Sequence, residues 1–216
     1  MIALDLPDGP LTVVALGAHP DDIEIGCGGT LLALAAAHPL TVHYVLPTGN
    51  ELRHAEARDA AKHFLSGAEV TFHFNGLPDG RLPGHWDEVK QQLEDVAAVC
   101  RPDLIFATRT DDAHQDHRLV AELVTTVWRG PLVLHYEIPK WDGDLGRVTH
   151  YVTLDQETAA RKVDLLNRCF PSQLSRAWWD DETFLALLRL RGIESQARYA
   201  EGFVVAKAVI GVGTAD

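Results

Sequence analysis

The feature that most constrains the fold is a nearly continuous apolar run at residues 11–17, which stops abruptly at His19-Pro20-Asp21-Asp22. A strand that is apolar at almost every position is typical of a parallel sheet covered on both faces, because a strand with one wet face alternates. The run therefore predicts a buried strand. One imidazole and two carboxylates at its end need a chemical reason, and a metal ion with a base beside it supplies one.

Strand-like and helical stretches alternate along the chain. The expected strands lie at about 11–17, 40–46, 69–74, 103–108, 132–137, 151–154 and 202–210. The expected helices lie at about 28–37, 52–65, 86–99, 156–169 and 181–191, with one more that ends near 128. Strict alternation predicts an α/β, Rossmann-like fold, a mostly parallel sheet flanked by helices, with a C-terminal helix and strand extension. No repeat or linker divides the chain, so we expect a single domain over residues 1–216.

Two glycine-containing stretches are expected to lie outside regular structure. Gly26-Cys27-Gly28-Gly29 reads as a turn before the first helix, and residues 75–84 read as a long loop of the kind that often carries function. A nucleotide-binding module is an alternative interpretation of the glycines. It is disfavoured because GCGG lacks the GxGxxG spacing and follows an acidic turn that would repel a pyrophosphate.

Charge and cysteine content narrow the partners and the compartment. The chain has 31 acidic and 19 basic residues, a formal net charge of −12, and phosphate backbones need clustered Lys and Arg, so we expect no nucleic-acid partner. Three cysteines without a CxxC pair argue against a thiolate zinc site and indicate a reducing compartment. No stretch approaches the ~20 apolar residues that span a bilayer, and no signal peptide is evident. We therefore expect a cytoplasmic protein with no membrane partner.

A second polar cluster, at residues 111–117, follows the fourth expected strand. Its His114 and His117 lie three residues apart at the start of a helix and so share a face. In an open parallel sheet, ligands bind beyond the carboxyl ends of the strands. One of these histidines can therefore complete a site begun by His19 and Asp22. Nitrogen and carboxylate oxygen are donors that Zn²⁺ accepts, and a catalytic zinc keeps three protein ligands and one open position.

The remaining carboxylates of the two clusters have predicted roles of their own. Asp21 neighbours a ligand but points elsewhere, which suits a general base. Asp116 sits between the two histidines, where it can orient His114 through a hydrogen bond. Either cluster alone also fits a plain turn with a helix-capping aspartate. Two clusters with complementary donors, at the ends of two parallel strands, favour metal-assisted hydrolysis of an acyl bond.

The order of these motifs carries a family resemblance. AHPDD followed by IEIGCGGTL, with HQDH about ninety residues later, resembles the PIG-L/LmbE family of zinc-dependent N-deacetylases, which pairs (A/P)HPDD with HxDH. The resemblance implies three zinc ligands, His19, Asp22 and His117. It implies Asp21 as the general base, and His114, oriented by Asp116, as the group that stabilises the oxyanion and protonates the leaving amine.

The resemblance also implies a small-molecule N-acetylated sugar or sugar conjugate as substrate and Zn²⁺ as cofactor, although Fe²⁺ or another divalent ion can use the same ligands. It allows a homo-oligomer. Two looser matches suggest substrate contacts, Arg53 in an R-x-x-E-[AL] helix and Asp79 in a Pro-Asp-Gly loop. Glu137, at the end of the fifth expected strand, is a third candidate. Each has an equally favoured plain alternative: a surface charge, a turn residue and a solvated strand end.

One position departs from the family pattern. Some members carry a tyrosine two residues before the first histidine of HxDH, and this chain has Asp112 there. More of the acid role then falls to His114. Two further interpretations stay open, an amidase that cleaves a larger conjugate such as a thiol-sugar adduct and a metal-binding protein without turnover. The complete HPDD and HQDH set disfavours the second.

Overall fold

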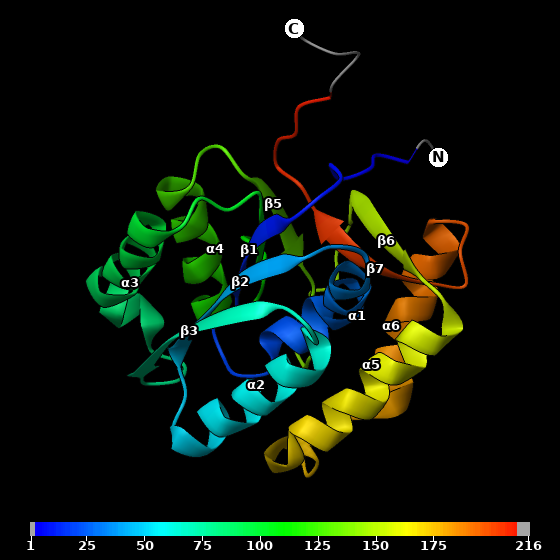
Figure 1. Cartoon of the computed structure of the whole chain (residues 1–216). Coiled ribbons are helices and arrows are strands. Elements are labelled where there is room, and N and C mark those ends of the chain that lie inside the picture. Colours follow the sequence, from blue (N-terminus) through cyan, green and yellow to red (C-terminus); the bar gives the residue numbers. More distant parts are fainter. Residues whose placement is uncertain (1–2, 211–216) are drawn as a thin grey trace, which may run out of the picture.

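The computed structural model describes residues 3–210 and is built around one sheet of seven strands in the order β3-β2-β1-β4-β5-β7-β6 (Figure 1). The strands are β1 (Leu11–Leu16), β2 (Leu40–Thr48), β3 (Glu69–Leu77), β4 (Leu104–Ala107), β5 (Leu132–Tyr136), β6 (His150–Leu154) and β7 (Tyr199–Val204). The first five run parallel, and β7 pairs antiparallel with both β5 and β6. The predicted α/β fold with a mostly parallel sheet is confirmed.

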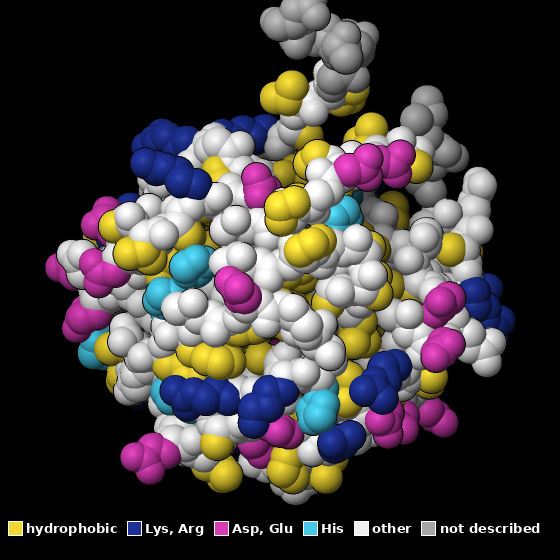
Figure 2. Space-filling view, in the orientation of Figure 1, with side chains coloured by type: hydrophobic (Ala, Val, Ile, Leu, Met, Phe, Trp, Pro, Cys, Tyr) yellow, Lys and Arg dark blue, Asp and Glu magenta, His cyan; other side chains and the backbone are white. Residues whose placement is uncertain are grey.

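Helices cover both faces of the sheet. They are α1 (Asp22–Ala37), α2 (Glu51–Phe64), α3 (Trp86–Val99), α4 (Gln115–Val127), α5 (Gln156–Cys169) and α6 (Asp181–Glu194), with short 3₁₀ turns at Leu82–His85 and Pro171–Gln173. Apolar residues of α3 and α4 form one core with the sheet, and those of α1, α2, α5 and the start of α6 form the other (Figure 1). On the surface seen in Figure 2, acidic and basic side chains are interspersed.

The strand order places the functional loops. The chain moves outward from β1 through β2 to β3 and then returns to the other side of β1 as β4. The direction of winding reverses between β1 and β4, and the loops that leave their carboxyl ends diverge to opposite faces, which opens the crevice where doubly wound sheets bind ligands. The two polar clusters of the sequence lie in these two loops.

Three local predictions are wrong. The stretch Gly26–Gly29 is not a turn but part of α1, which begins at Asp22 and is broken at Cys27 (φ −140°, ψ 16°). A Cβ atom at Gly26 would collide with the Tyr136 ring, so this glycine serves close packing rather than a turn. The expected loop at 75–84 is shorter, because β3 continues to Leu77 and a 3₁₀ turn begins at Leu82.

The predicted closing strand at 202–210 lies instead at Tyr199–Val204, where residues 199–203 pair with β6, and residues 205–210 are not in a strand. No helix in the described range has the length and apolar character needed to cross a membrane. The prediction of one domain over residues 1–216 includes residues outside the described range and stays a prediction.

Candidate metal centre and active site

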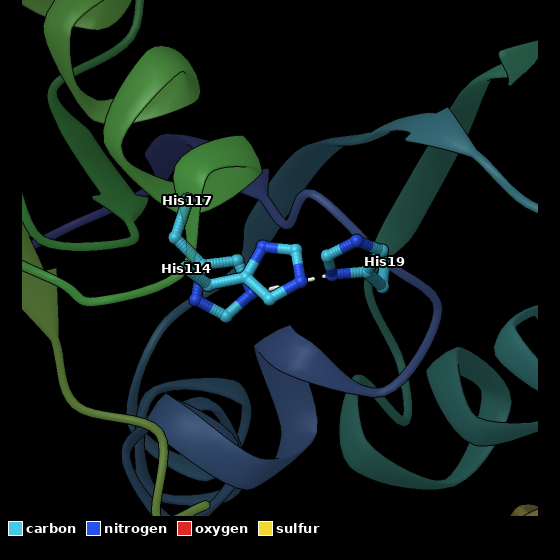
Figure 3. Close-up of side chains that lie close together, drawn as sticks. All are labelled: His19, His114 and His117. Carbon is cyan, nitrogen blue, oxygen red and sulfur yellow. Dashed lines mark hydrogen bonds between the residues drawn. The ribbon is translucent and has the colours of Figure 1, made fainter. Parts of the chain in front are cut away.

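The site forms where the loop after β1 meets the loop after β4. His19 lies in the first loop and Asp22 is the first residue of α1, while His114 and His117 come from the start of α4. Figure 3 shows the three imidazoles turned toward one another across the gap between these segments. The structure therefore brings together side chains that lie about ninety-five residues apart in the chain.

Three donor atoms form a nearly regular triangle. His19 Nδ1 lies 3.2 Å from His117 Nε2 and 3.4 Å from Asp22 Oδ2, and His117 Nε2 lies 3.3 Å from Asp22 Oδ2. Ligands about 2.0–2.1 Å from a tetrahedral ion lie about 3.3 Å from one another. The spacing and the N, N, O donor set therefore fit one divalent metal ion. The backbone N–H groups of Ala18 and His19 each donate to Asp22 Oδ2 at 2.9 Å, which fixes this carboxylate.

Each of the two histidines in the triangle has a carboxylate behind it. His117 Nδ1 lies 3.0 Å from Asp112 Oδ2, and His19 Nε2 lies 3.2 Å from Asp116 Oδ2. Metal-ligating histidines commonly donate their second N–H to a carboxylate, which fixes the tautomer and the ring orientation. Both carboxylates are buried. The arrangement orients the two rings with Nδ1 of His19 and Nε2 of His117 facing the same point.

The prediction that the Asp116 carboxylate orients His114 is wrong. Among the described residues this carboxylate accepts from the backbone N–H groups of Gly80 (2.7 Å) and Leu82 (3.0 Å) and contacts His19. His114, the predicted partner, is held by the backbone instead, since the backbone N–H of Asp116 donates to His114 Nδ1 at 3.2 Å. Helix geometry explains the difference: His114 is the N-cap of α4, so its ring turns back onto the first turn.

The role of Asp112 was not predicted from the sequence, where this residue stood out only as a replacement for a tyrosine. In the structure its carboxylate holds His117 and also accepts from the backbone N–H of His114 at 2.8 Å. Lys140, from the loop after β5, lies 3.0 Å from its other side. The available signal was an aspartate two residues before the first histidine of the cluster.

Asp21 lies beside the triangle in a strained turn. It is 6% exposed and has φ +119°, which is rare for a residue other than glycine and is typical of functional sites. Arg53 Nη2 donates to its Oδ2 at 2.7 Å and also contacts the Pro20 carbonyl. Burial raises the pKa of Asp21 to about 7, although the positive charge of Arg53 opposes the shift. Arg53, predicted to touch substrate, is thus engaged with Asp21 and, at 2.7 Å, with Glu56.

The charges of the centre are those of a cation site. Burial would lower the pKa of His117, but the Asp22 and Asp112 carboxylates outweigh it and raise that pKa to about 9. Burial would raise the pKa of Asp22, but His117 and His19 hold it well below its usual range. Protons on the histidines thus balance the carboxylates here. Because metal ligands bind in their deprotonated form, a divalent ion can replace those protons.

His114 has a different character. Burial and the neighbouring His117 and His19 lower its pKa, so the ring is neutral near pH 7. Since Nδ1 accepts from Asp116 N–H, the hydrogen bond assigns the ring proton to Nε2. The ring centroid lies 4.8 Å from that of His19 and 4.7 Å from that of His117 (Figure 3). His114 therefore carries a neutral N–H donor next to the triangle.

The remaining predicted contacts differ in access to solvent. The Asp79 side chain is 80% exposed, and its Oδ1 lies 3.0 Å from His19 Nε2, so it borders the centre on its open side. Glu137 is buried, and its two oxygens contact Arg191 (2.6 and 2.8 Å) and Arg109 (3.2 Å). These contacts are those of a structural ion-pair cluster, and a substrate contact by Glu137 stays a prediction.

Another group of possible donors lies apart from the centre. Asp59 and His63 of α2 approach Cys169 at the end of α5, with donor atoms within 4.8 Å of one another. The Arg168 guanidinium, however, lies 3.3 Å from His63 Nε2. A fixed positive charge therefore lies beside this group and disfavours a cation there.

Comparison with known proteins agrees with the motifs. The sequence model of the family described as PIG-L, GlcNAc-PI de-N-acetylase, matches residues 14–128, more than half of the chain. The chain belongs to the PIG-L family. The uncharacterized deacetylase YaiS of Escherichia coli (strain K12) is 34% identical over 139 residues, which cover 59% of this chain and 74% of YaiS. Family membership and this relative together support deacetylase activity.

Two solved structures share the PIG-L fold of this chain. The N,N'-diacetylchitobiose deacetylase of Pyrococcus horikoshii is 18% identical, with a TM-score of 0.70 over 90% of this chain and 83% of that one. GalB, the 4-carboxy-2-hydroxymuconate hydratase of Pseudomonas putida KT2440, is 17% identical, with a TM-score of 0.71 over 96% of this chain and 100% of that one. At these identities the likeness shows the fold alone, and the fold carries more than one chemistry.

Proposed function

We propose that this chain is a metal-dependent deacetylase that removes the N-acetyl group of an amino sugar or sugar conjugate and releases acetate and a free amine. The observation that carries the proposal is the triangle of His19 Nδ1, Asp22 Oδ2 and His117 Nε2 at 3.2–3.4 Å, with the buried Asp21 carboxylate beside it. Zn²⁺ is the expected ion, and Fe²⁺ suits the same donors.

A divalent ion held by His19, Asp22 and His117 would supply an activated water and a polarised amide carbonyl. Asp21 accepts a proton from the attacking water, and Arg53 holds its carboxylate in place. The Nε2–H of His114 donates to the carbonyl oxygen as negative charge develops there. The C–N bond then breaks, and the proton taken up by Asp21 goes to the leaving nitrogen, so the carboxylate returns to its starting state.

The proposed substrate class follows from the surroundings of the centre and from the relatives. Asp79, exposed next to His19, is placed to accept hydrogen bonds from sugar hydroxyls. The family is described as GlcNAc-PI de-N-acetylase and the Pyrococcus neighbour is named as an N,N'-diacetylchitobiose deacetylase, so both names refer to N-acetylated sugars. A small sugar substrate accords with the acidic net charge of −12, since no phosphate backbone has to be neutralised. The reduced cysteines support a cytoplasmic location.

Acetate release by the metal-loaded protein tests the proposal. Purified protein is stripped of metal, reloaded with Zn²⁺ or Fe²⁺ and incubated with N-acetylglucosamine, its oligosaccharides and N-acetylated sugar conjugates, and acetate and free amine are measured together. We expect equal amounts of both from at least one compound, and none from the His117→Ala variant. Release of a larger acid in place of acetate would favour an amidase. Metal binding without any release from the panel would contradict the proposal.

The GalB likeness defines a second outcome of the same assay. A hydratase adds water to a carbon–carbon double bond, so it would form no amine and no acetate. Asp21 beside a metal site also suits activation of water for such an addition. The family match and the 34% identity to YaiS favour the deacetylase.

A further inference from the structure

Helix α1, which begins with the metal donor Asp22, is broken one turn later. The backbone at Cys27 (φ −140°, ψ 16°) divides it into a short first segment, Asp22–Gly26, and a longer second segment that ends at Ala37. A break leaves carbonyl groups of the first segment and N–H groups of the second without partners inside the helix. Since these groups are buried, other side chains have to satisfy them.

Glu201 of β7 satisfies the N–H groups of the second segment. Its Oε1 accepts from the backbone N–H of Gly29 at 2.8 Å, and its Oε2 accepts from the backbone N–H of Thr30 at 2.7 Å and from Thr30 Oγ1 at 2.6 Å. The carboxylate is buried, and its remaining contact is with Lys162. It thus acts as a cap supplied from a distant strand.

Lys162 of α5 serves the other side of the break. Its Nζ donates to the Ile25 carbonyl at 2.6 Å and to Glu201 Oε1 at 2.6 Å. A positive group at the C-terminus of the first segment and a negative group at the N-terminus of the second each oppose the partial charges of a helix end. The pair therefore spans the break, with the positive Lys162 at the end of the first segment and the negative Glu201 at the start of the second.

We propose that Lys162 and Glu201 are positioning residues for the metal centre, which rests on the function proposed above. The first segment of α1 is too short to be stable alone, and it follows the strained Asp21. Lys162 holds its C-terminal end, three residues beyond Asp22. The pair thereby sets where the Asp21 and Asp22 carboxylates stand relative to His117.

A purely stabilising role explains these contacts less well. A buried ion pair is weak evidence for stability, because apolar residues of similar volume often replace one without loss. What apolar residues cannot do is satisfy the Ile25 carbonyl and the Gly29 and Thr30 amides at once. Both charged residues also lie outside residues 14–128, the part matched by the family model. The C-terminal part of the chain thus completes a site whose donors all lie elsewhere.

The variants Lys162→Met and Glu201→Gln test the proposal in the full chain. Co²⁺ affinity is measured by titration followed by visible absorption of the bound ion, and kcat and KM are measured on the best substrate. We expect Co²⁺ binding weakened by roughly 10–100-fold, as for loss of groups that orient metal ligands. We also expect a changed Co²⁺ spectrum and a lower kcat with KM within about twofold of wild type.

A matched control separates positioning from stability. Leu93→Ala removes buried apolar contacts on α3, in the core on the opposite face of the sheet, and should lower Tm without changing Co²⁺ affinity. Thr30→Val, which removes one hydrogen bond to Glu201 and keeps the side-chain shape, covers the case in which the charge variants do not fold. It should weaken Co²⁺ binding severalfold.

Unchanged Co²⁺ affinity in the folded variants, within about twofold of wild type, would overturn the proposal. The measurement is independent of the proposed reaction, because the titration contains no substrate. If the wild-type protein bound Co²⁺ but released no acetate from any compound, the proposed function would fail. The positioning role would still be decided by the affinities.

Discussion

The two parts of the chain contribute to the centre in opposite ways. The part from β1 to α4 supplies every donor of the triangle, and Asp21 and His114, the proposed base and oxyanion donor, come from the same loops. The part from α5 to β7 supplies no donor to the triangle but contributes buried charged groups to two clusters, Lys162–Glu201 and Arg191–Glu137. The metal donors thus all come from the part of the chain that forms the switch point between β1 and β4, and part of their support comes from the C-terminal part.

Metal removal is the largest test of this division. Chelation should lower the rate of acetate release by at least roughly a thousandfold. The reason is that a metal ion supplies several kcal/mol of transition-state stabilisation, and each ~1.4 kcal/mol is tenfold in rate. Added Zn²⁺ should restore the activity and raise Tm, since an ion that binds only the folded state stabilises it. Activity that persists in metal-free protein, verified by elemental analysis, would place the chemistry on other residues.

Neighbouring carboxylates of the first part should respond differently to the same change. Asp21→Asn should lower kcat by ~10²–10⁴-fold with metal content retained, because it removes a proton acceptor and no ligand. Asp22→Asn, the matched control one residue away, should lose the metal as well, because its Oδ2 is a corner of the triangle. Loss of metal in both variants would show that Asp21 is a ligand rather than the base.

The same division explains what the sequence could reveal. His19, Asp22 and His117 were predictable because each donor type stands in a short motif at a strand end, and the parallel order brings those ends together. The contact between the Asp116 carboxylate and His19 was not predictable, since the direction of a side chain at a helix start depends on which residue is the N-cap. The α1 break was hidden too, because glycines that permit close packing against Tyr136 look like turn glycines.

Residues of the part from β1 to α4 also position the metal donors, and the Asp112→Asn variant measures how much one of them contributes to metal affinity. Asp112→Asn should weaken metal binding by ~10–100-fold, because the His117 ring loses the carboxylate that fixes its orientation. Asp111→Asn is the control: the side chain is 68% exposed, pairs with Arg109 and makes no described contact with the triangle. Equal metal affinities for the two variants, measured by chelator competition, would show that Asp112 does not position His117 for metal binding.

The smallest expected effect on metal affinity comes from the cluster of Glu137 with Arg191 and Arg109. Glu137→Gln leaves Arg191 and Arg109 without their shared buried partner, so the free energy of unfolding should fall by about 3 kcal/mol, less whatever Glu194 and Asp111 retain. Yet neither arginine forms a hydrogen bond or ion pair with α1 among the described residues, so Co²⁺ affinity and kcat of the folded protein should stay within about twofold of wild type.

Glu137→Gln and Glu201→Gln together decide how specific the support is. Both remove one buried negative charge, and of the two only Glu201 accepts from backbone N–H groups at the α1 break. Calorimetry should show both variants destabilised, while Co²⁺ titration should separate them by at least roughly tenfold. Equal weakening in the two would mean that any loss of buried charge there disturbs the centre, and the break in α1 would have no special part in holding Asp22.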